Sequence, residues 1–271
     1  MSVLTYLQDA AEQLTLSEAE RERISHTLTQ VQENLSVHFR NGVIRKQFCF
    51  GSWARRTALP RRINPESDID YMIVFDRTTR VKPQALMDRL RGFAEEYFPR
   101  SDMHQSRPTV VLSLNRYRLE LVPAYEHWLW GLQIPARTSD YLDWTSTNPA
   151  SFEAELNRKD ADHGGHIRPI VRLLKYWNVV NNYVFDSFAI ERAVIDHSLS
   201  WVTPNLQARL FSVIEGLPTS GLSKAKRASV EEARGIIQRV EHLQTNEFPE
   251  YAEIELTRLI PEMKQLRPSR S

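Results

Sequence analysis

The order of hydrophobic and polar positions predicts a helical start to the chain. Residues 3–39 are expected to be helical, and Ser17-Glu18-Ala19-Glu20 within them has the form of a capping box. Apolar residues then recur at spacings of three and four, which gives one apolar helix face, formed by Ile24, Leu28, Val31, Leu35 and Phe39. Asn41-Gly42 breaks the helix after this face.

Short apolar runs occupy most of the remaining first half. They predict strands at Val43–Phe50, Asp68–Phe75, Thr109–Leu114 and Tyr117–Val122. The last two are joined tightly at Asn115-Arg116 and are expected to form a hairpin. Helices are expected over Trp53–Leu59 and Pro83–Phe98. The first half is therefore expected to be α+β, with a small mixed or antiparallel sheet.

From about residue 150 the pattern becomes helical. A helix is predicted over Ile167–Asn181, and Ser187 has the character of the cap of the next one. Further helices are expected at 204–215, 229–246 and 248–266, with a flexible loop at Gly216–Ser223. The change is one of composition, without a linker, so we expect two domains, residues 1–150 and 151–271, that share an interface.

Composition and charge narrow the class of protein. The chain of 271 residues is 41% hydrophobic, enough to bury a core, and its net charge of +1 argues against a dedicated nucleic-acid coating protein. Its single cysteine, Cys49, excludes an intrachain disulfide and a cysteine-rich zinc site. The start of the sequence lacks the pattern of a signal peptide, and no apolar stretch is long enough to span a membrane. We expect a cytoplasmic protein without a membrane partner.

Two aspartates open one of the predicted strands. Asp68 and Asp70 lie two positions apart, so their side chains share a face, while Ile69, Tyr71 and Ile73 point to the other face. Two neighbouring carboxylates repel each other unless a cation lies between them, and oxygen ligands of this kind suit Mg²⁺ or Mn²⁺. An Asp-x-Asp pair alone is common in loops and turns, but a pair inside a strand that follows a Gly-Ser junction is much rarer.

Glu120 supplies a third acid in the alternating strand YRLELVPA, on the same face as Arg118. If the two strands are neighbours, the three acids converge on one patch. Such a trio can hold two metal ions that act on the attacking and leaving oxygens of an in-line phosphoryl displacement. The alternative is that Glu120 is an ordinary solvated residue of a hairpin.

Gly51 and Ser52 lie where a strand ends and a helix is expected to begin. Glycine allows the backbone to approach a phosphate closely, and free N–H groups and a serine hydroxyl donate to anions. Taken alone, this pair is more typical of an ordinary turn capped by serine. Its position before the Asp68–Asp70 strand favours a phosphate-binding role.

These segments resemble a known family of nucleotidyltransferases. The runs Gly51–Thr57 and Ser67–Tyr71 look like the polymerase-β-type signature. The finer resemblance is to the branch of 2′–5′-oligoadenylate synthetases, cyclic GMP–AMP synthase and the bacterial cyclic-oligonucleotide synthases of antiphage defence. Five later segments agree with that branch in order and spacing: LELVPA at 119–124, Ile134-Pro135, Trp144 with Asn148-Pro149, Arg172–Asn178 and Asp186–Glu191.

The resemblance implies a polymerase-β-like catalytic domain over residues 1–150 and a helical domain over 151–271 that closes the nucleotide cleft. It also assigns roles by position. Gly51 and Ser52 would hold the triphosphate, and Lys175 and Ser187 would contact the donor's phosphates. Asp68, Asp70 and Glu120 would be the catalytic, metal-binding acids. Without the resemblance, Lys175 is a solvated helix residue and Ser187 a plain N-cap.

Three features depart from this pattern or lie outside it. The third acid of this branch is commonly Asp, so Glu120 is longer by one methylene. Arg61 and Arg62 are candidates to contact an acceptor strand, or are simply solvated. His163 and His166 flank two glycines, an arrangement in which histidines are more often not metal ligands.

The expected function is metal-dependent nucleotidyl transfer from nucleoside triphosphates, with release of pyrophosphate. The favoured product is a cyclic or linear oligonucleotide that acts as a second messenger in antiphage defence, made with Mg²⁺ or Mn²⁺ and under a nucleic-acid or protein activator. Transfer onto tRNA or protein is an alternative, and so is a nucleotide- or RNA-binding module with a dead site. Intact Asp68 and Asp70 argue against the dead module. The near-zero net charge mildly disfavours tRNA.

Overall fold

The computed structural model describes residues 2–40, 42–76, 82–106, 109–114, 117–136, 143–199, 205–246 and 248–263. The chain forms two compact units. One contains residues 17–58 and 66–153, and the other contains the residues up to Leu16, residues 59–65 and the chain from Ala154 onward. The predicted division near residue 150 therefore has two exceptions, because the first helix and the 59–65 segment group with the C-terminal residues.

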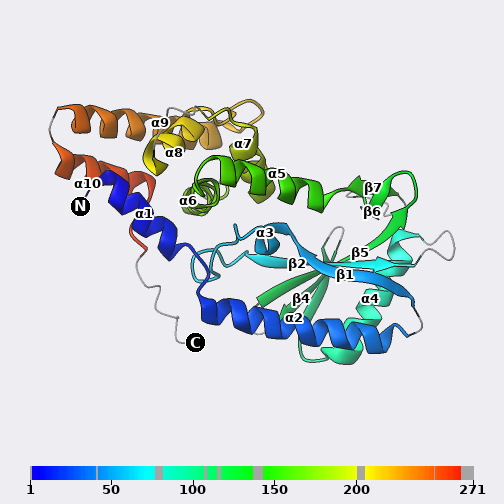
Figure 1. Ribbon diagram of the computed structural model, residues 1–271. Coiled ribbons are helices and arrows are strands. Elements are labelled where there is room, and N and C mark those ends of the chain that lie inside the picture. Colours follow the sequence, from blue (N-terminus) through cyan, green and yellow to red (C-terminus); the bar gives the residue numbers. More distant parts are fainter. Residues whose placement is uncertain are drawn as a thin grey trace. The chain divides into compact units, whose positions relative to one another are not determined.

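The first unit is built on a mixed sheet of seven strands (Figure 1). The strands are β1 (Ile44–Phe50), β2 (Asp68–Phe75), β3 (Asp102–Ser106), β4 (Thr109–Leu114), β5 (Tyr117–His127), β6 (Gly131–Pro135) and β7 (Trp144–Thr147). Five of them follow the order β1-β2-β5-β4-β3, and β6 joins β5 to β7. Among the strands that the structure describes, β2 and β5 pair in parallel and the other pairs are antiparallel. The predicted α+β class with a mixed sheet is confirmed, and β3, β6 and β7 add to the predicted strands.

Two helices, α2 (Glu18–His38) and α4 (Pro83–Tyr97), cover one face of this sheet (Figure 1). The apolar positions of α2 pack with those of α4 and with Ile69, Tyr71 and Ile73 of β2, so the predicted inward face of β2 is confirmed. The opposite face carries a smaller apolar cluster of Met72, Val74, Val122 and Ala124. Asp68 and Asp70 alternate with the buried face of β2 and therefore lie on this second side.

The predicted single helix over residues 3–39 is two helices. α1 (Val3–Gln13) is followed by its C-cap, Leu14, and α2 starts after Ser17. The Ser17 hydroxyl accepts from the Glu20 N–H at 3.2 Å, and the Glu20 carboxylate accepts from the Ser17 N–H at 3.2 Å. This capping box was predicted, but its consequence was missed. A capped N-terminus in mid-sequence marks the start of a new helix, and it separates α1 from α2.

The second unit is helical. It contains α1, most of α5 (Pro149–Asp162), and α6 (Ile167–Val180), α7 (Ser187–Asp196), α8 (Leu206–Glu215), α9 (Lys224–Thr245) and α10 (Pro249–Leu259). α9 begins earlier than predicted because Ser223 caps it, with its hydroxyl accepting from the Lys226 N–H at 3.3 Å. No helix that the structure describes has both the length and the apolar character needed to cross a lipid bilayer.

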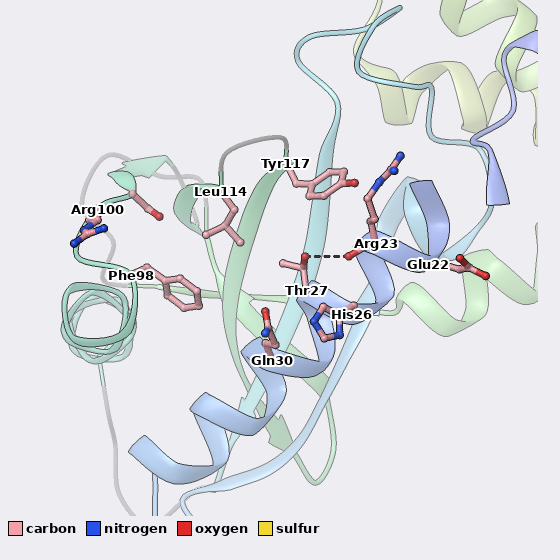
Figure 2. Close-up of a pocket in the computed structure, with 10 residues that line it drawn as sticks. Glu22, Arg23, His26, Thr27, Gln30, Phe98, Arg100, Leu114 and Tyr117 are labelled. Atoms are coloured by element: carbon pink, nitrogen blue, oxygen red, sulfur yellow. Dashed lines mark hydrogen bonds between the residues drawn. The ribbon is translucent and has the colours of Figure 1, made fainter. Parts of the chain in front are cut away.

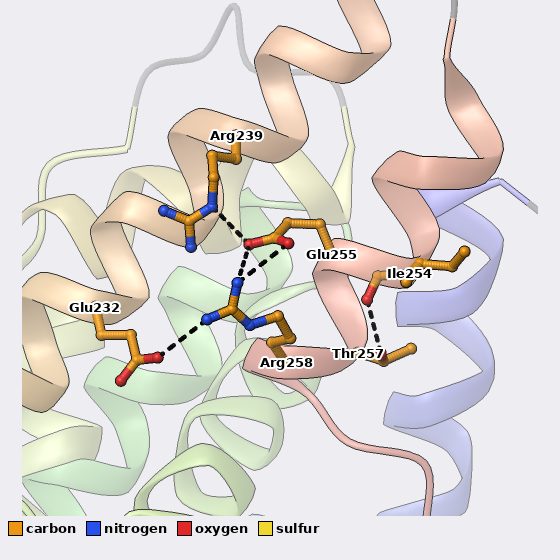
Figure 3. A network of polar contacts seen from close by, with 6 residues as sticks. All are labelled: Glu232, Arg239, Ile254, Glu255, Thr257 and Arg258. Carbon is orange, nitrogen blue, oxygen red and sulfur yellow. Dashed lines mark hydrogen bonds and ion pairs between the residues drawn. The ribbon is translucent and has the colours of Figure 1, made fainter.

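An ion-pair network joins α9 to α10 (Figure 3). Glu255 accepts from Arg239 at 2.6 Å and from Arg258 at 3.0 Å, and Arg258 also reaches Glu232 at 3.4 Å. Burial alone would raise the pKa of the Glu255 carboxyl. The hydrogen bond from Arg239 and the charges of both arginines outweigh burial and lower that pKa below its usual value.

Glu255→Gln is expected to lower the free energy of unfolding by about 1 kcal/mol near neutral pH, because two arginines lose their anionic partner. A lowered pKa means that this stabilisation is present above the usual value of 4.5 and is lost as the pH falls through the folded-state value. Urea unfolding of both proteins across acidic and neutral pH measures the difference. Glu12→Gln, at an exposed position of α1, is the control. A Glu255→Gln deficit that did not shrink in acid would contradict the electrostatic account.

Candidate active site

The parallel pairing of β2 with β5 brings the three predicted acids together. Asp68 lies opposite Arg118 and Asp70 lies opposite Glu120. Residues in register on neighbouring strands point to the same face of a sheet. Asp68, Asp70 and Glu120 therefore share one face, the one not covered by α2 and α4. The strands are neighbours, as the predicted convergence required.

The pKa of the Asp68 carboxyl reflects both its burial and the neighbouring acids. Its pKa is raised from 3.8 to about 8, first by burial and then by the charges of Asp70 and Glu120 and a hydrogen bond with Glu120. The nearby charge of Arg118 only partly offsets this rise. At neutral pH the Asp68 carboxyl is consequently held mostly in its protonated form, and the patch has an excess of negative charge that one arginine does not neutralise.

Both carboxylate oxygens of Glu120 have partners within the sheet unit. Arg118 donates to Oε1 at 3.3 Å, and the buried Thr109 donates to Oε2 at 3.3 Å. The other end of the Arg118 guanidinium donates to Glu66 at 3.0 Å. Sequence reasoning placed Arg118 on this face but gave it no role, and it missed Thr109 and Glu66. The strand alternation was the available signal for Arg118, whereas Glu66 precedes β2 in a segment without a pattern.

The donor chemistry of the patch suits a hard divalent cation. Three carboxylates offer the oxygen ligands that Mg²⁺ and Mn²⁺ prefer, and the raised pKa of Asp68 shows that negative charge is crowded here. As the side chains are placed, however, no group of three or more His, Cys, Asp or Glu among the described residues is arranged to hold a metal ion. The oxygens of Glu120 are engaged with Arg118, Thr109 and Asp68 instead. Metal binding would therefore require these side chains to exchange partners.

Gly51 brings the backbone directly against the Asp70 carboxylate. It begins the short helix α3 (Gly51–Ala54) with a φ of 70°, in the left-handed region that favours glycine. A Cβ at this position would lie 1.7 Å from Oδ2 of Asp70. The partly buried Ser52 follows in the same turn. The Gly-Ser junction and the acid pair, which are separated in sequence, are thus one structural feature.

The helix predicted over Trp53–Leu59 is wrong in both bounds. α3 starts at Gly51 and stops at Ala54 because Arg56 takes a φ of 59°, a left-handed conformation that ends helices. The N–H groups of Thr57 and Ala58 then both bond to the Ser52 carbonyl, at 2.9 and 3.1 Å. These bonds close the turn around Ser52.

Lys175 and Ser187 belong to the helical unit. Lys175 is only 5% exposed, and its ammonium lies 2.5 Å from the Glu191 carboxylate, so its interpretation as a solvated helix residue is wrong. Ser187 is exposed and is the first residue of α7. The cap is Asp186, which accepts from the Phe188 N–H at 2.8 Å. The interpretation of Ser187 as a plain N-cap is therefore also wrong, and the phosphate contacts of both residues stay predictions.

Three other candidates have local partners. Arg61 donates to the Pro65 carbonyl and Arg62 to the Gln13 carbonyl, each at 3.0 Å. Nδ1 of His166 lies 2.8 Å from the Arg209 guanidinium. Burial and then the charge of Arg209 lower the pKa of His166. The guanidinium thus lies beside Nδ1, one of the two ring nitrogens that could bind a metal, and its charge disfavours a second cation there.

A groove of about 900 Å³ lies on the other side of the sheet unit (Figure 2). It runs between α2, the segment after α4 and the ends of β4 and β5, and is lined by Glu22, Arg23, His26, Thr27, Gln30, Phe98, Arg100, Ser101, Leu114 and Tyr117. Tyr117 alternates with Arg118 along β5 and so points away from the carboxylates. None of the predicted site residues lines this groove.

Gly51→Ala is expected to destabilise the fold by about 1–3 kcal/mol, because the new methyl group overlaps Asp70 and because alanine disfavours this φ. Gly92→Ala is the matched control. Gly92 lies inside α4 with open space around it, so alanine there should stabilise by up to about 1 kcal/mol. Thermal unfolding of the two variants measures the contrast. Equal stability of Gly51→Ala and the wild type would show that Asp70 does not approach the turn.

The raised pKa of Asp68 predicts a pH dependence of stability. A carboxyl that holds its proton more tightly in the folded chain contributes most below pH 3.8, and the contribution is lost as the pH rises to about 8. Asp68→Asn cannot ionise. In buffer with a metal chelator, the wild type should therefore lose stability relative to Asp68→Asn as the pH rises from 3.8 to about 8. Parallel urea-unfolding curves at every pH would contradict the crowding of charge at Asp68.

Known proteins with the same organisation were found by sequence and by structure. The family model described as "Second Messenger Oligonucleotide or Dinucleotide Synthetase domain" matches residues 1–160. A cyclic AMP-AMP-AMP synthase of Acinetobacter sp. is 24% identical over 138 residues, which cover 49% of this chain and 39% of the relative. A probable cyclic nucleotide synthase of Bacillus cereus is 22% identical over 183 residues, which cover 55% and 54%. The alignments thus span about half or less of these relatives.

Solved structures share the fold along almost the whole chain. The structure of E. coli MS115-1 CdnC with ATP matches with a TM-score of 0.72 and 14% identity, covering 97% of this chain and 98% of that one. Bradyrhizobium diazoefficiens CdnG with GTP matches with a TM-score of 0.69 and 13% identity, covering 94% and 97%. These similarities confirm the polymerase-β-like fold expected from the sequence. By the match of its family model, the chain belongs to the second messenger oligonucleotide or dinucleotide synthetase family of nucleotidyltransferases.

Proposed function

We propose that this protein joins nucleoside monophosphates, taken from nucleoside triphosphates, into a cyclic or linear oligonucleotide and releases pyrophosphate. The observation that carries the proposal is the register of β2 and β5, which puts Asp68, Asp70 and Glu120 on one face beside the Gly51 turn. Family membership and the relatives named as cyclic nucleotide synthases support the same chemistry.

Asp68, Asp70 and Glu120 are the residues that would hold Mg²⁺ or Mn²⁺. Such an ion, when bound, supplies positive charge to the attacking and leaving oxygens of an in-line displacement. For Asp68 to act as a ligand, its carboxyl must give up the proton that the crowding of acids retains. For Glu120 to act as a ligand, one carboxylate oxygen must turn to the ion while the hydrogen bond on the other oxygen still holds the side chain.

The Gly51-Ser52 turn holds the substrate in this proposal, and Glu120 orients it. Ser52 and the backbone after Gly51 supply donors to the triphosphate oxygens. Glu120 orients the acceptor hydroxyl and takes its proton as the hydroxyl oxygen bonds to the α-phosphorus. The bond from that phosphorus to the bridging oxygen breaks, and pyrophosphate leaves with the electron pair. Positioning and electrostatic stabilisation carry most of the catalysis in such transfers.

Lys175 and Ser187 are two further residues for which we propose contacts with the donor's phosphates, and both belong to the helical unit. The exposed Ser187 hydroxyl is accessible to a phosphate oxygen. Lys175 is held by Glu191 in a buried position, where a charge is screened less than at the surface. We assign both residues to the phosphates of the donor, where point charges and hydroxyl donors bind without base preference.

The cellular setting is part of the proposal. We place the protein in the cytoplasm and its product in antiphage signalling, as the resemblance of the sequence implied. A protein or nucleic-acid activator also belongs here. One structural neighbour, E. coli MS115-1 CdnC, has been solved in a complex with HORMA-deltaN, which supports a protein partner for this fold.

Purified protein incubated with labelled ATP, GTP, CTP and UTP and with Mg²⁺ or Mn²⁺ should yield pyrophosphate and short oligonucleotides or cyclic products, identified by mass spectrometry. Glu120→Gln keeps the shape but removes the charge, and turnover should fall by orders of magnitude. Glu120→Asp should keep part of the activity, because the branch commonly uses Asp there. The double variant Asp68→Asn, Asp70→Asn is the inactive control. Label found only on added tRNA or protein would contradict the second-messenger proposal.

A further inference from the structure

The carboxylate of Glu120 is harder to hold in one place than that of an aspartate would be. It has one more rotatable bond than Asp, so its carboxylate has more places to go and more conformational entropy to lose when it is fixed. A residue that binds a metal ion or orients a substrate must be held closely in place. Some neighbour must therefore restrict the longer side chain.

Two side chains restrict Glu120 by taking one oxygen each. Thr109 Oγ1 donates to Oε2 from β4, and the Arg118 guanidinium donates to Oε1 from two positions earlier on β5. Arg118 is itself fixed by its bond to Glu66. The side chains of Glu120 and Arg118 are 16% and 25% exposed, so this is not an ion pair of the open surface.

Arg118 has a second effect, which opposes the first. Its guanidinium donates to Oε1 of Glu120, which is also an oxygen that a metal ion would use. A guanidinium in this place competes with any divalent cation for the same carboxylate oxygens.

We propose that Arg118 is a positioning residue, which fixes the Glu120 carboxylate for the reaction and weakens the binding of the divalent cation in exchange. The inference rests on the proposed function, because it assumes that Glu120 acts on metal and acceptor. It assigns to Arg118 a role through Glu120 and no contact with substrate. Thr109 and Glu66 support the same arrangement from either end.

The test compares Arg118→Gln with Arg45→Gln in the full chain. Arg45 is the matched control, since its pair with Asp76, at 3.6 Å, lies elsewhere in the sheet unit and both side chains are exposed. Mn²⁺ affinity is measured without nucleotide, from the electron paramagnetic resonance signal of free Mn²⁺, and turnover is measured with triphosphates. Circular dichroism verifies that each variant is folded. If Arg118→Gln does not fold, Arg118→Lys still tests the proposal, because unchanged turnover of that variant would overturn it.

Arg118→Gln should bind Mn²⁺ about fivefold more tightly, because a competing cation is gone. Its kcat should nevertheless fall by about tenfold to a hundredfold, because Glu120 is no longer held. Arg118→Lys keeps the charge without the planar fork, so it should retain wild-type Mn²⁺ affinity and lose turnover. Arg45→Gln should match the wild type in both measurements. Weaker or unchanged Mn²⁺ binding by Arg118→Gln, or unchanged turnover, would overturn the proposal.

A double-mutant cycle separates this proposal from the proposed function. In a Glu120→Gln background, Arg118→Gln should no longer change Mn²⁺ affinity, because the two residues act as one unit. The cycle needs no catalytic turnover. If the wild type makes no product from triphosphates, the proposed function fails. The cycle then still decides whether Arg118 acts through Glu120. If Arg118→Gln changed the Mn²⁺ affinity as much in the Glu120→Gln background as in the wild type, the inference would be overturned.

Discussion

Electrostatic repulsion between carboxylates, imposed by the parallel pairing of β2 with β5, is the constraint around which the sheet unit is arranged. The register leaves Asp70 and Glu120 side by side and Asp68 one step along the same face. The fold accommodates this charge by retaining a proton on Asp68 and by placing Arg118 and Thr109 on Glu120. A bound cation can replace the proton of Asp68 or a hydrogen bond to Glu120. We therefore connect the close spacing of these acids with metal-dependent chemistry.

One face of the sheet stabilises the unit, and the other face carries the residues proposed for the chemistry. On one face, α2 and α4 bury the alternate residues of β2 and β5 in the main core of the sheet unit. Because that face is fixed, the carboxylates on the other face are held on a rigid platform. Gly51 then brings the backbone against Asp70, so the strand that carries the acids and the turn proposed to bind phosphate share one surface.

Alternation within a strand made the acid face predictable, because side chains repeat every two residues whatever the sheet topology. The sequence could not tell that β2 and β5 are parallel neighbours, which depends on pairing between distant segments. For the same reason Glu66, 52 positions from Arg118, was missed. The start of α3 at Gly51 depended on backbone torsions that no apolar pattern reports. The alternative interpretation of Lys175, a solvated helix residue, was wrong because its partner Glu191 lies on another helix.

The central claim is that Asp68, Asp70 and Glu120 form one divalent-metal site. Anomalous X-ray scattering from crystals of the protein grown with Mn²⁺ and a non-hydrolysable triphosphate tests it most directly. The account predicts anomalous peaks within coordination distance of oxygens from all three side chains, with the triphosphate beside Gly51 and Ser52. A triphosphate bound there with Mn²⁺ coordinated by other residues, or with the Glu120 carboxylate outside coordination distance of the metal, would contradict this claim.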